Sequence, residues 1–262
     1  MKLPRFFFSA ALLLLLHAAA TPAGAQFRSA MHSAPPPSVL HPAPSNWWIG
    51  PMAGANLNTH SGDFTTDFCD CDFEDGSGAG LSVGLEVGHY LSSTFAVALK
   101  AVYSDLRADY SYQILEDAEV IDEGLVEDVL FERRNTVILG YFMLHPVLQL
   151  HPVNWLYLFA GPAVGVKTTA TQEYTKVVTD ERFAFELGDG DTRIVSRDTG
   201  ELPRAESLRA DLRIGIGANL RLSRSILFAP EASFGYPITT ISDDDNWSAQ
   251  AFHLIGILKF EL

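Results

Sequence analysis

The chain has 262 residues and a net charge of −14, from 18 Lys and Arg against 32 Asp and Glu. Hydrophobic residues make up 47% of it, which excludes a disordered chain. The acidic balance excludes a nucleic-acid partner, because phosphate binding needs clustered Lys and Arg. Only one long uncharged apolar run exists, and there are only 2 Cys, so a polytopic helical membrane protein and a disulfide-dense scaffold are also excluded.

The N-terminal residues 1–25 have the three parts of a secretory signal peptide. Lys2 and Arg5 form a basic start, residues 6–20 are apolar, and residues 23–25 (Ala-Gly-Ala) offer small side chains for cleavage. About 15 apolar residues are too few to cross a ~30 Å hydrocarbon core comfortably, so a transmembrane anchor is the less favoured alternative. We therefore expect an exported mature chain.

Residues 26–46 are rich in proline, with Pro35, Pro36 and Pro37 in a row and Pro42 and Pro44 close behind. Proline lacks a backbone donor and favours extended polyproline geometry. We expect this segment to be a linker without a packed core, and the folded domain to span residues 47–262.

The rest of the chain alternates with period two, the pattern of strands with two different faces. The clearest segment is 208–222, where apolar residues alternate with Arg209, Asp211, Arg213, Gly215, Gly217, Asn219 and Arg221. The pattern predicts one uninterrupted strand. Strands of soluble sheets typically have about five or six residues, whereas a tilted membrane strand needs about 9–11.

Seven further segments show a similar alternation: 49–58, 81–88, 95–104, 134–150, 156–174, 226–235 and 252–262. Both faces of 134–150 are apolar, so its inward face is not assigned. The connections 91–94, 151–155 and 223–225 are tight, whereas 60–78, 113–130, 175–203 and 242–247 are long or polar. This predicts an all-β fold, an eight-stranded antiparallel up-and-down transmembrane β-barrel with short periplasmic turns and long extracellular loops.

Aromatic residues lie near both predicted membrane surfaces. Those near the short turns are Trp47, Trp48, Tyr90, Phe95, Trp155 and Tyr157, and those near the long loops are Tyr103, Tyr110, Tyr236 and Trp247. Amphipathic rings favour the headgroup level, so these residues predict two aromatic girdles. Ordinary core aromatics are the alternative.

Three short motifs and the last strand carry a family resemblance. The motifs are residues 84–92 (Gly-Leu-Glu-Val-Gly-His-Tyr-Leu-Ser), 158–162 (Leu-Phe-Ala-Gly-Pro) and 215–218 (Gly-Ile-Gly-Ala). With them, residues 47–262 resemble OmpA/OmpX-type outer-membrane barrels, and more closely the PorT-like barrel domains of Bacteroidetes-like bacteria. The chain ends in Leu262, which departs from the terminal Phe frequent in this family.

The resemblance implies a location and partners. The location is the outer membrane of a Gram-negative bacterium. The implied partners are membrane lipid, lipopolysaccharide and the barrel assembly machinery, and we expect a monomer.

Charged residues are expected inside the barrel if the apolar face meets lipid. They are Glu86, Lys100, Arg209, Asp211, Arg213, Glu231 and Lys259. An eight-stranded barrel is only wide enough for side chains to fill, so these charges should pair and form a plug. A narrow ion path is the alternative. Room for the long side chains is expected at Gly161, Ala163, Gly165, Gly215 and Gly217.

Cys69 and Cys71 lie one residue apart in the first long connection. In an oxidising compartment a local disulfide is favoured. A metal thiolate site or a bridge to another chain are the alternatives, with only His60 near as a further ligand.

The long connections are acidic. The first carries Asp63, Asp67, Asp70, Asp72, Glu74 and Asp75, the second Glu116, Asp117, Glu119, Asp122, Glu123, Glu127 and Asp128, and the fourth Asp243, Asp244 and Asp245. Such oxygens could bind Ca²⁺ or Mg²⁺, but the pattern of a calcium-binding loop is lacking, so a solvated surface is favoured. We expect no metal site and no cofactor.

Catalytic signatures are not evident. The sequence has no G-x-S-x-G, no H-E-x-x-H and no phosphate loop, and His145 and His151 each precede a proline, which suits strand ends near a turn. We expect a non-enzymatic structural or surface-interaction role in the cell envelope. The alternatives are an accessory barrel of a secretion system, implied by the PorT-like resemblance, a narrow solute or ion channel, and a membrane-embedded enzyme.

Overall fold

A computed structural model describes residues 46–66, 68–120, 125–180, 182–183, 193–202, 204–242 and 246–262. The predicted signal peptide and the linker up to residue 45 lie outside the described residues. No helix in the described ranges is long and apolar enough to cross a membrane.

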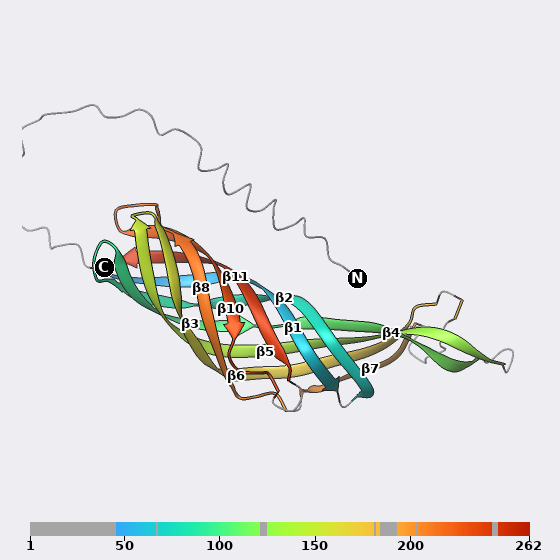
Figure 1. Cartoon of the computed structure of the whole chain (residues 1–262). Helices are drawn as coiled ribbons and strands as arrows, with labels where there is room; N and C mark the ends of the chain where they lie inside the picture. The colour runs from blue at the N-terminus through green and yellow to red at the C-terminus, as the bar shows by residue number, and fades with distance from the viewer. Residues whose placement is uncertain are drawn as a thin grey trace, which may run out of the picture. The chain divides into compact units, whose positions relative to one another are not determined.

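The structure consists of antiparallel strands (Figure 1). They are β1 (Trp47–Thr66), β2 (Cys69–Tyr90), β3 (Phe95–Asp105), β4 (Ala108–Val120), β5 (Leu125–Val153), β6 (Leu156–Val178), β7 (Ile194–Glu201), β8 (Leu208–Ala218), β9 (Leu220–Arg221), β10 (Ile226–Pro237) and β11 (Ser248–Glu261).

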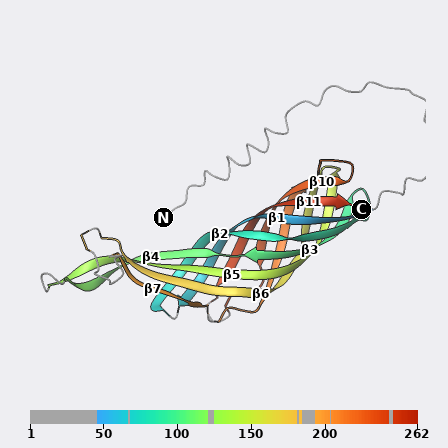
Figure 2. The same cartoon turned by 180° about the vertical axis from the view of Figure 1, so that it is seen from behind.

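The strands close into a ring because β1 pairs with β2 on one side and with β11 on the other. The order around the ring is β1-β2-β3-β5-β6-β8-β10-β11. Strand β4 continues β3 after two residues, and β9 continues β8. The predicted all-β ring of eight antiparallel strands is therefore confirmed (Figures 1 and 2).

The clearest predicted strand, 208–222, is not continuous. It is divided at Asn219, whose backbone N–H donates to the carbonyl of Trp155 in the β5–β6 turn, 2.7 Å away. The prediction of an uninterrupted strand was wrong. The side chains alternate through Asn219, but its backbone N–H bonds to a turn and not to the neighbouring strand, which interrupts the ladder.

Two of the four long connections, 60–78 and 113–130, are mostly strand. β1 and β2 extend to residues 66 and 69, and β4 and β5 form a hairpin through most of 113–130. These connections are long, as predicted, but they continue as paired strands, because backbone pairing needs no apolar side chains.

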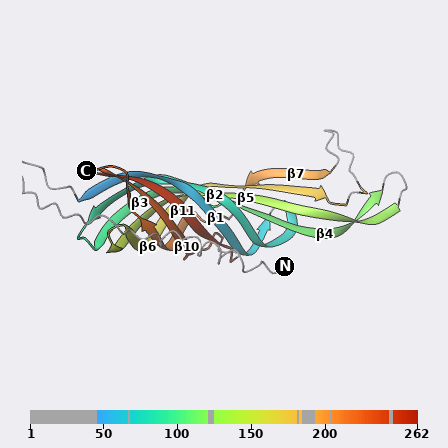
Figure 3. The same cartoon turned by 90° about the horizontal axis from the view of Figure 1, so that it is seen from above.

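Four strand segments project beyond the ring, and we call them the extension (Figures 1 and 3). The extension comprises residues 113–120, 125–133, 175–178 and 194–197, paired in the order β4-β5-β6-β7. Strand β4 meets β2 at Ser77 opposite Asp109. A small core of Val129, Phe131 and Val178 stabilises the extension, with Ile114, Ala118, Phe183 and Val195 packed against it.

The two faces of the ring differ in chemistry. All eight ring strands place large apolar side chains on the outside, with exposed fractions such as 55% for Ile214 and 53% for Leu85. Alternate residues point inward and are buried. In 134–150, whose facing was left open, the odd-numbered residues point inward, from Asn135 to Gln149.

Candidate functional site

The interior near the short turns holds a network of four charges and two aromatic side chains, which we call the lower network. Lys100 forms ion pairs with Glu231 and, at 3.5 Å, with Glu86. Lys259 Nζ lies 3.5 Å from Glu86 Oε1. The indole of Trp48 donates to Glu86 Oε1 at 2.6 Å, and the hydroxyl of Tyr157 donates to Glu231 Oε1 at 2.8 Å. Two cations thus balance two carboxylates.

Further along the lumen, β8 places Arg209 and Arg213 on either side of Asp211. We call these two cations, with the carboxylate that they share, the arginine pair. Arg209 lies 2.8 Å from Asp211 Oδ1, and Arg213 lies 3.2 Å from Asp211 Oδ2. Arg209 also donates to the carbonyl of Ala249 at 2.6 Å and lies over the ring of Tyr141. All three charged side chains are at most 4% exposed, so water screens them little.

Aromatic rings pack together inside the ring near the long connections, and we call this cluster the aromatic plug. The hydroxyl of Tyr110 lies 2.8 Å from His60 Nδ1 and accepts a hydrogen bond from the Trp247 indole at 2.9 Å. Phe64 stacks on Trp247 with a centroid distance of 4.6 Å. These buried side chains fill the interior with hydrogen-bonded and stacked contacts.

The structure places the seven charges that the sequence analysis assigned to the lumen inside the ring, all buried. It also brings in side chains that the sequence analysis assigned elsewhere or did not weigh, namely Trp48, Tyr157, His60, His145 and His253. His145 lies opposite Lys100 in the middle of β5, away from the strand end proposed for it. The sequence did contain a signal for this inward position, because His145 is next to Leu144 in a strand and adjacent residues of a strand face opposite sides.

The inner glycines do not leave room for the charged chains. A Cβ on Gly215 would lie 2.5 Å from Phe159, one on Gly217 would lie 2.4 Å from Tyr157, and one on Gly165 would lie 2.3 Å from Met143. The expectation of space at these positions was wrong, because ring and thioether side chains of neighbouring strands occupy it.

The predicted girdles are only partly on the outer face. Trp47, Phe95, Trp155 and Tyr236 are exposed, with Tyr90 and Tyr103 intermediate. Trp48, Tyr157, Tyr110 and Trp247 are buried inside the ring, at 0 to 2% exposure, and so do not belong to a girdle. Adjacent residues such as Trp47 and Trp48 lie on opposite faces of a strand, so both cannot face lipid.

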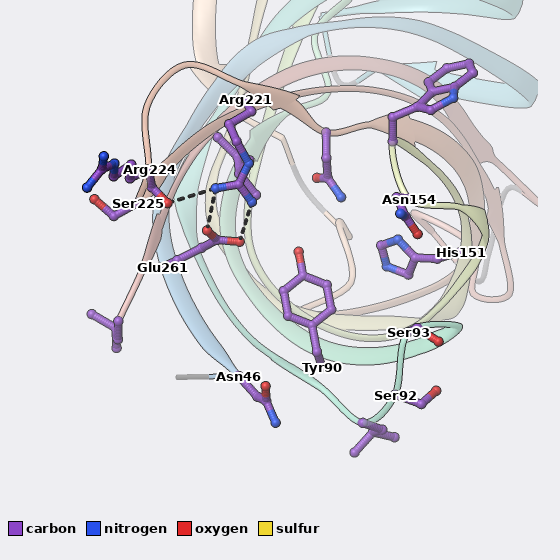
Figure 4. A pocket seen from close by; sticks show the side chains of 15 residues that line it. Asn46, Tyr90, Ser92, Ser93, His151, Asn154, Arg221, Arg224, Ser225 and Glu261 are labelled. Carbon is purple, nitrogen blue, oxygen red and sulfur yellow. Dashed lines mark hydrogen bonds and ion pairs between the residues drawn. The ribbon is translucent and has the colours of Figure 1, made fainter. Parts of the chain in front are cut away.

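A pocket of about 1010 Å³ opens at the short-turn end of the ring. In Figure 4, Tyr90 and His151 point toward its middle, and Arg221 lies against Glu261 at its edge. The Arg221 guanidinium donates to Glu261 Oε2 at 3.2 Å and to the carbonyl of Arg224 at 2.8 Å. Asn219 connects the pocket to the lower network, since Lys259 Nζ lies 3.4 Å from its Oδ1.

Cys69 and Cys71 form a disulfide, with a Cα–Cα distance of 5.2 Å. It lies at the start of β2, next to the aromatic plug, where Cys71 is buried. The described residues contain no group of three or more His, Cys, Asp or Glu side chains placed to hold a metal ion. Asp67 and residues 121–124 and 243–245 of the acidic connections lie outside the described residues.

Within the extension, acidic residues differ in their surroundings. Glu116 forms ion pairs with Arg133 and Lys176. Burial opposes its ionisation, but the hydrogen bonds and charges of these two cations outweigh that effect and lower the pKa of Glu116. Asp117 lies opposite Asp128, and a hydrogen bond with that carboxyl and its negative charge raise the pKa of Asp117.

No protein-family model matches the chain, and no curated protein matches its sequence. Among solved structures, neisserial surface protein A covers 84% of this chain and is itself covered completely, at 9% identity and a TM-score of 0.37. The outer membrane protein AlkL, solved in lipid bilayers, covers 88% of this chain and is covered to 98%, at 13% identity and a TM-score of 0.37. The outer membrane protease OmpT of Escherichia coli covers 86% and is covered to 99%, at 8% identity and a TM-score of 0.35. At this level of similarity, the fold assignment rests on the strand pairing of the chain itself.

Proposed function

We propose that this chain is an integral outer-membrane barrel of a Gram-negative bacterium, with a plugged lumen and a non-enzymatic structural or surface-interaction role. The observation that carries the proposal is the apolar outer face around the whole closed ring. Soluble monomers rarely expose contiguous apolar patches larger than a few hundred Å². A closed ring also satisfies its strand edges internally, as a hydrocarbon environment requires.

The plugged lumen supports a structural role over transport. Buried ion pairs of the lower network and the arginine pair occupy the interior, and the aromatic plug packs inside the ring near the long connections. An eight-stranded ring has no space for a porin-like channel beside these side chains. We expect no conductance at the level of an open porin in planar bilayers.

The extension supports a role in surface contacts. It would lie outside the membrane on the long-connection side, and it exposes Leu115 and Val126 beside the carboxylates of Asp117 and Asp128. Signal-peptide export, suggested by residues 1–25, is consistent with this location.

An accessory role in secretion is the second candidate. The PorT-like motifs suggest it, and the pocket at the short-turn end offers polar groups to a periplasmic partner. Deletion of the gene followed by measurement of secreted protein separates the two candidates: lost secretion favours the accessory role, and unchanged secretion favours the structural one.

Membrane fractionation with heat-modifiable gel mobility tests the location. We expect the protein in the outer-membrane fraction, migrating faster when unheated. Protease added to whole cells should cleave within 113–133. A protein found wholly in the soluble periplasmic fraction would overturn the proposal.

A further inference from the structure

The charges buried in the lumen do not balance. The cations are Lys100, Lys259, Arg209 and Arg213, and the carboxylates are Glu86, Asp211 and Glu231, all at most 5% exposed. Within the described part of the chain, the interior therefore holds one more cation than carboxylate.

The excess is confined to the arginine pair. Both lysines of the lower network lie within ion-pair distance of a glutamate. Arg209 and Arg213 share the single carboxylate of Asp211, and among the described residues no other carboxylate forms an ion pair with either. A guanidinium does not lose its proton in proteins, so this charge cannot be removed by titration.

Such a charge is costly in a dry interior unless another charge compensates it. Hydrogen-bond donors next to it also lack acceptors. Arg209 Nε, Arg213 Nε and both ring nitrogens of His253, one of which carries the N–H, are buried without a partner in the protein. A neutral imidazole carries one N–H. His145 donates its own to the backbone of Gly161, whereas the N–H of His253 has no acceptor in the protein.

These groups lie in one region of the lumen. The ring of His145 is hydrogen-bonded to the backbone of Gly161, which pairs with Arg213. His253 lies within electrostatic reach of Arg213, Arg209 and His145. Gly235 pairs with Arg213, and a Cβ there would lie in ordinary van der Waals contact with Arg213 Nε, at 3.7 Å.

We propose that the lumen binds one small monovalent inorganic anion, chloride being the simplest, between the guanidinium groups of Arg209 and Arg213 and the ring of His253. A halide accepts hydrogen bonds and donates none, which matches a set of donors without acceptors. Its single charge equals the excess of the arginine pair. The anion is a structural ligand that completes the plug.

Anomalous diffraction locates the anion directly. Crystals of the mature protein, refolded in detergent and grown in sodium bromide, should show a bromide peak within contact distance of Arg213 and His253. Water density at this position, or bromide at the protein surface alone, would overturn the proposal.

Folding equilibria test the same site in solution. At constant ionic strength, with gluconate replacing chloride, each tenfold rise in chloride above the dissociation constant should multiply the folding constant about tenfold. In Arg213→Gln this dependence should disappear. Arg221→Gln, the same change at the exposed mouth, is the matched control and should keep the wild-type slope.

A second variant keeps the test informative if Arg213→Gln does not fold. Ser233 is buried and pairs with both Gly215 and His253, so Ser233→Asp brings a carboxylate to the arginine pair. This variant should fold without chloride dependence and show no bromide peak. A flat chloride response in the wild type, or an unchanged slope in Ser233→Asp, would contradict the proposal.

Discussion

The indole Nε1 of Trp48 donates a hydrogen bond to Glu86 Oε1 across 2.6 Å, between two neighbouring strands and inside the ring. Trp48 and Glu86 are both fully buried. The bond therefore stabilises a carboxylate from which water is excluded, and it connects the start of β1 to the lower network.

Trp48→Phe should destabilise the barrel by about 1–3 kcal/mol, because it leaves one oxygen of a buried carboxylate without its donor. Urea titrations of the protein folded into lipid vesicles would measure the loss. Trp47→Phe is the matched control, since Trp47 is 51% exposed on the outer face. Equal losses in both variants would contradict a specific role for the indole of Trp48.

Gly88→Ala should cost about 1–3 kcal/mol by overpacking. A Cβ there would lie 2.0 Å from the Trp48 ring, whereas one on Gly235 would meet nothing closer than 3.6 Å. Gly235→Ala should therefore be tolerated in the same vesicle titration. Tolerance of both substitutions would show that Trp48 does not occupy this position.

Lys100→Met should destabilise by about 3–5 kcal/mol, because it leaves Glu231 as an uncompensated buried carboxylate. Adding Glu231→Gln should recover part of the loss, because the charge that needed Lys100 is then gone. A double-mutant cycle measures this coupling, and strictly additive losses would argue against the ion pair.

Ile214→Arg should cost about 2–4 kcal/mol, the penalty for a cation facing lipid near the midplane. Ile214 is 55% exposed on the outer face of β8, between the buried Arg213 and the inner Gly215. Vesicle folding titrations would measure it, with Arg224→Ala in the exposed turn as the control. A harmless Ile214→Arg would show that this face does not meet lipid.

Acid should weaken the extension through Glu116. Its pKa is lowered in the folded state, so its ion pairs stabilise the fold above the ordinary carboxyl range and cease to do so as the pH falls through the lowered value. Hydrogen exchange of peptides 108–137 should show less protection in Glu116→Gln than in the wild type at pH about 7. The difference should vanish only once the pH lies below the lowered pKa of Glu116. A difference that persists there would contradict the role of the Glu116 charge.

Side-chain alternation was sufficient to predict the eight-stranded ring and the inward direction of residues such as Arg209, Asp211 and Arg213. Alternation with period two assigns each residue to one of two faces. Because the charged residues share one face and occupy the interior, the apolar face must lie on the outside of the ring. The same rule, applied strictly to Trp47 and Trp48, would have placed Trp48 inside. The length of the polar hairpins was not predictable in this way, because Asp, Ser and Thr carry no apolar signal while their backbones still pair.

Contacts across the lumen were decided only by the tertiary structure. The sequence determined that charges face inward, but closure of the ring decides that Lys100 meets Glu231, 131 positions away, and that Arg209 donates to the carbonyl of Ala249 on another strand. Strand register and closure determine these distances, and both depend on every pairing around the ring. The space beside Gly215 and Gly217 was likewise decided by the tertiary structure. A glycine has no side chain, and only the pairing of the neighbouring strand places the rings of Phe159 and Tyr157 in that space.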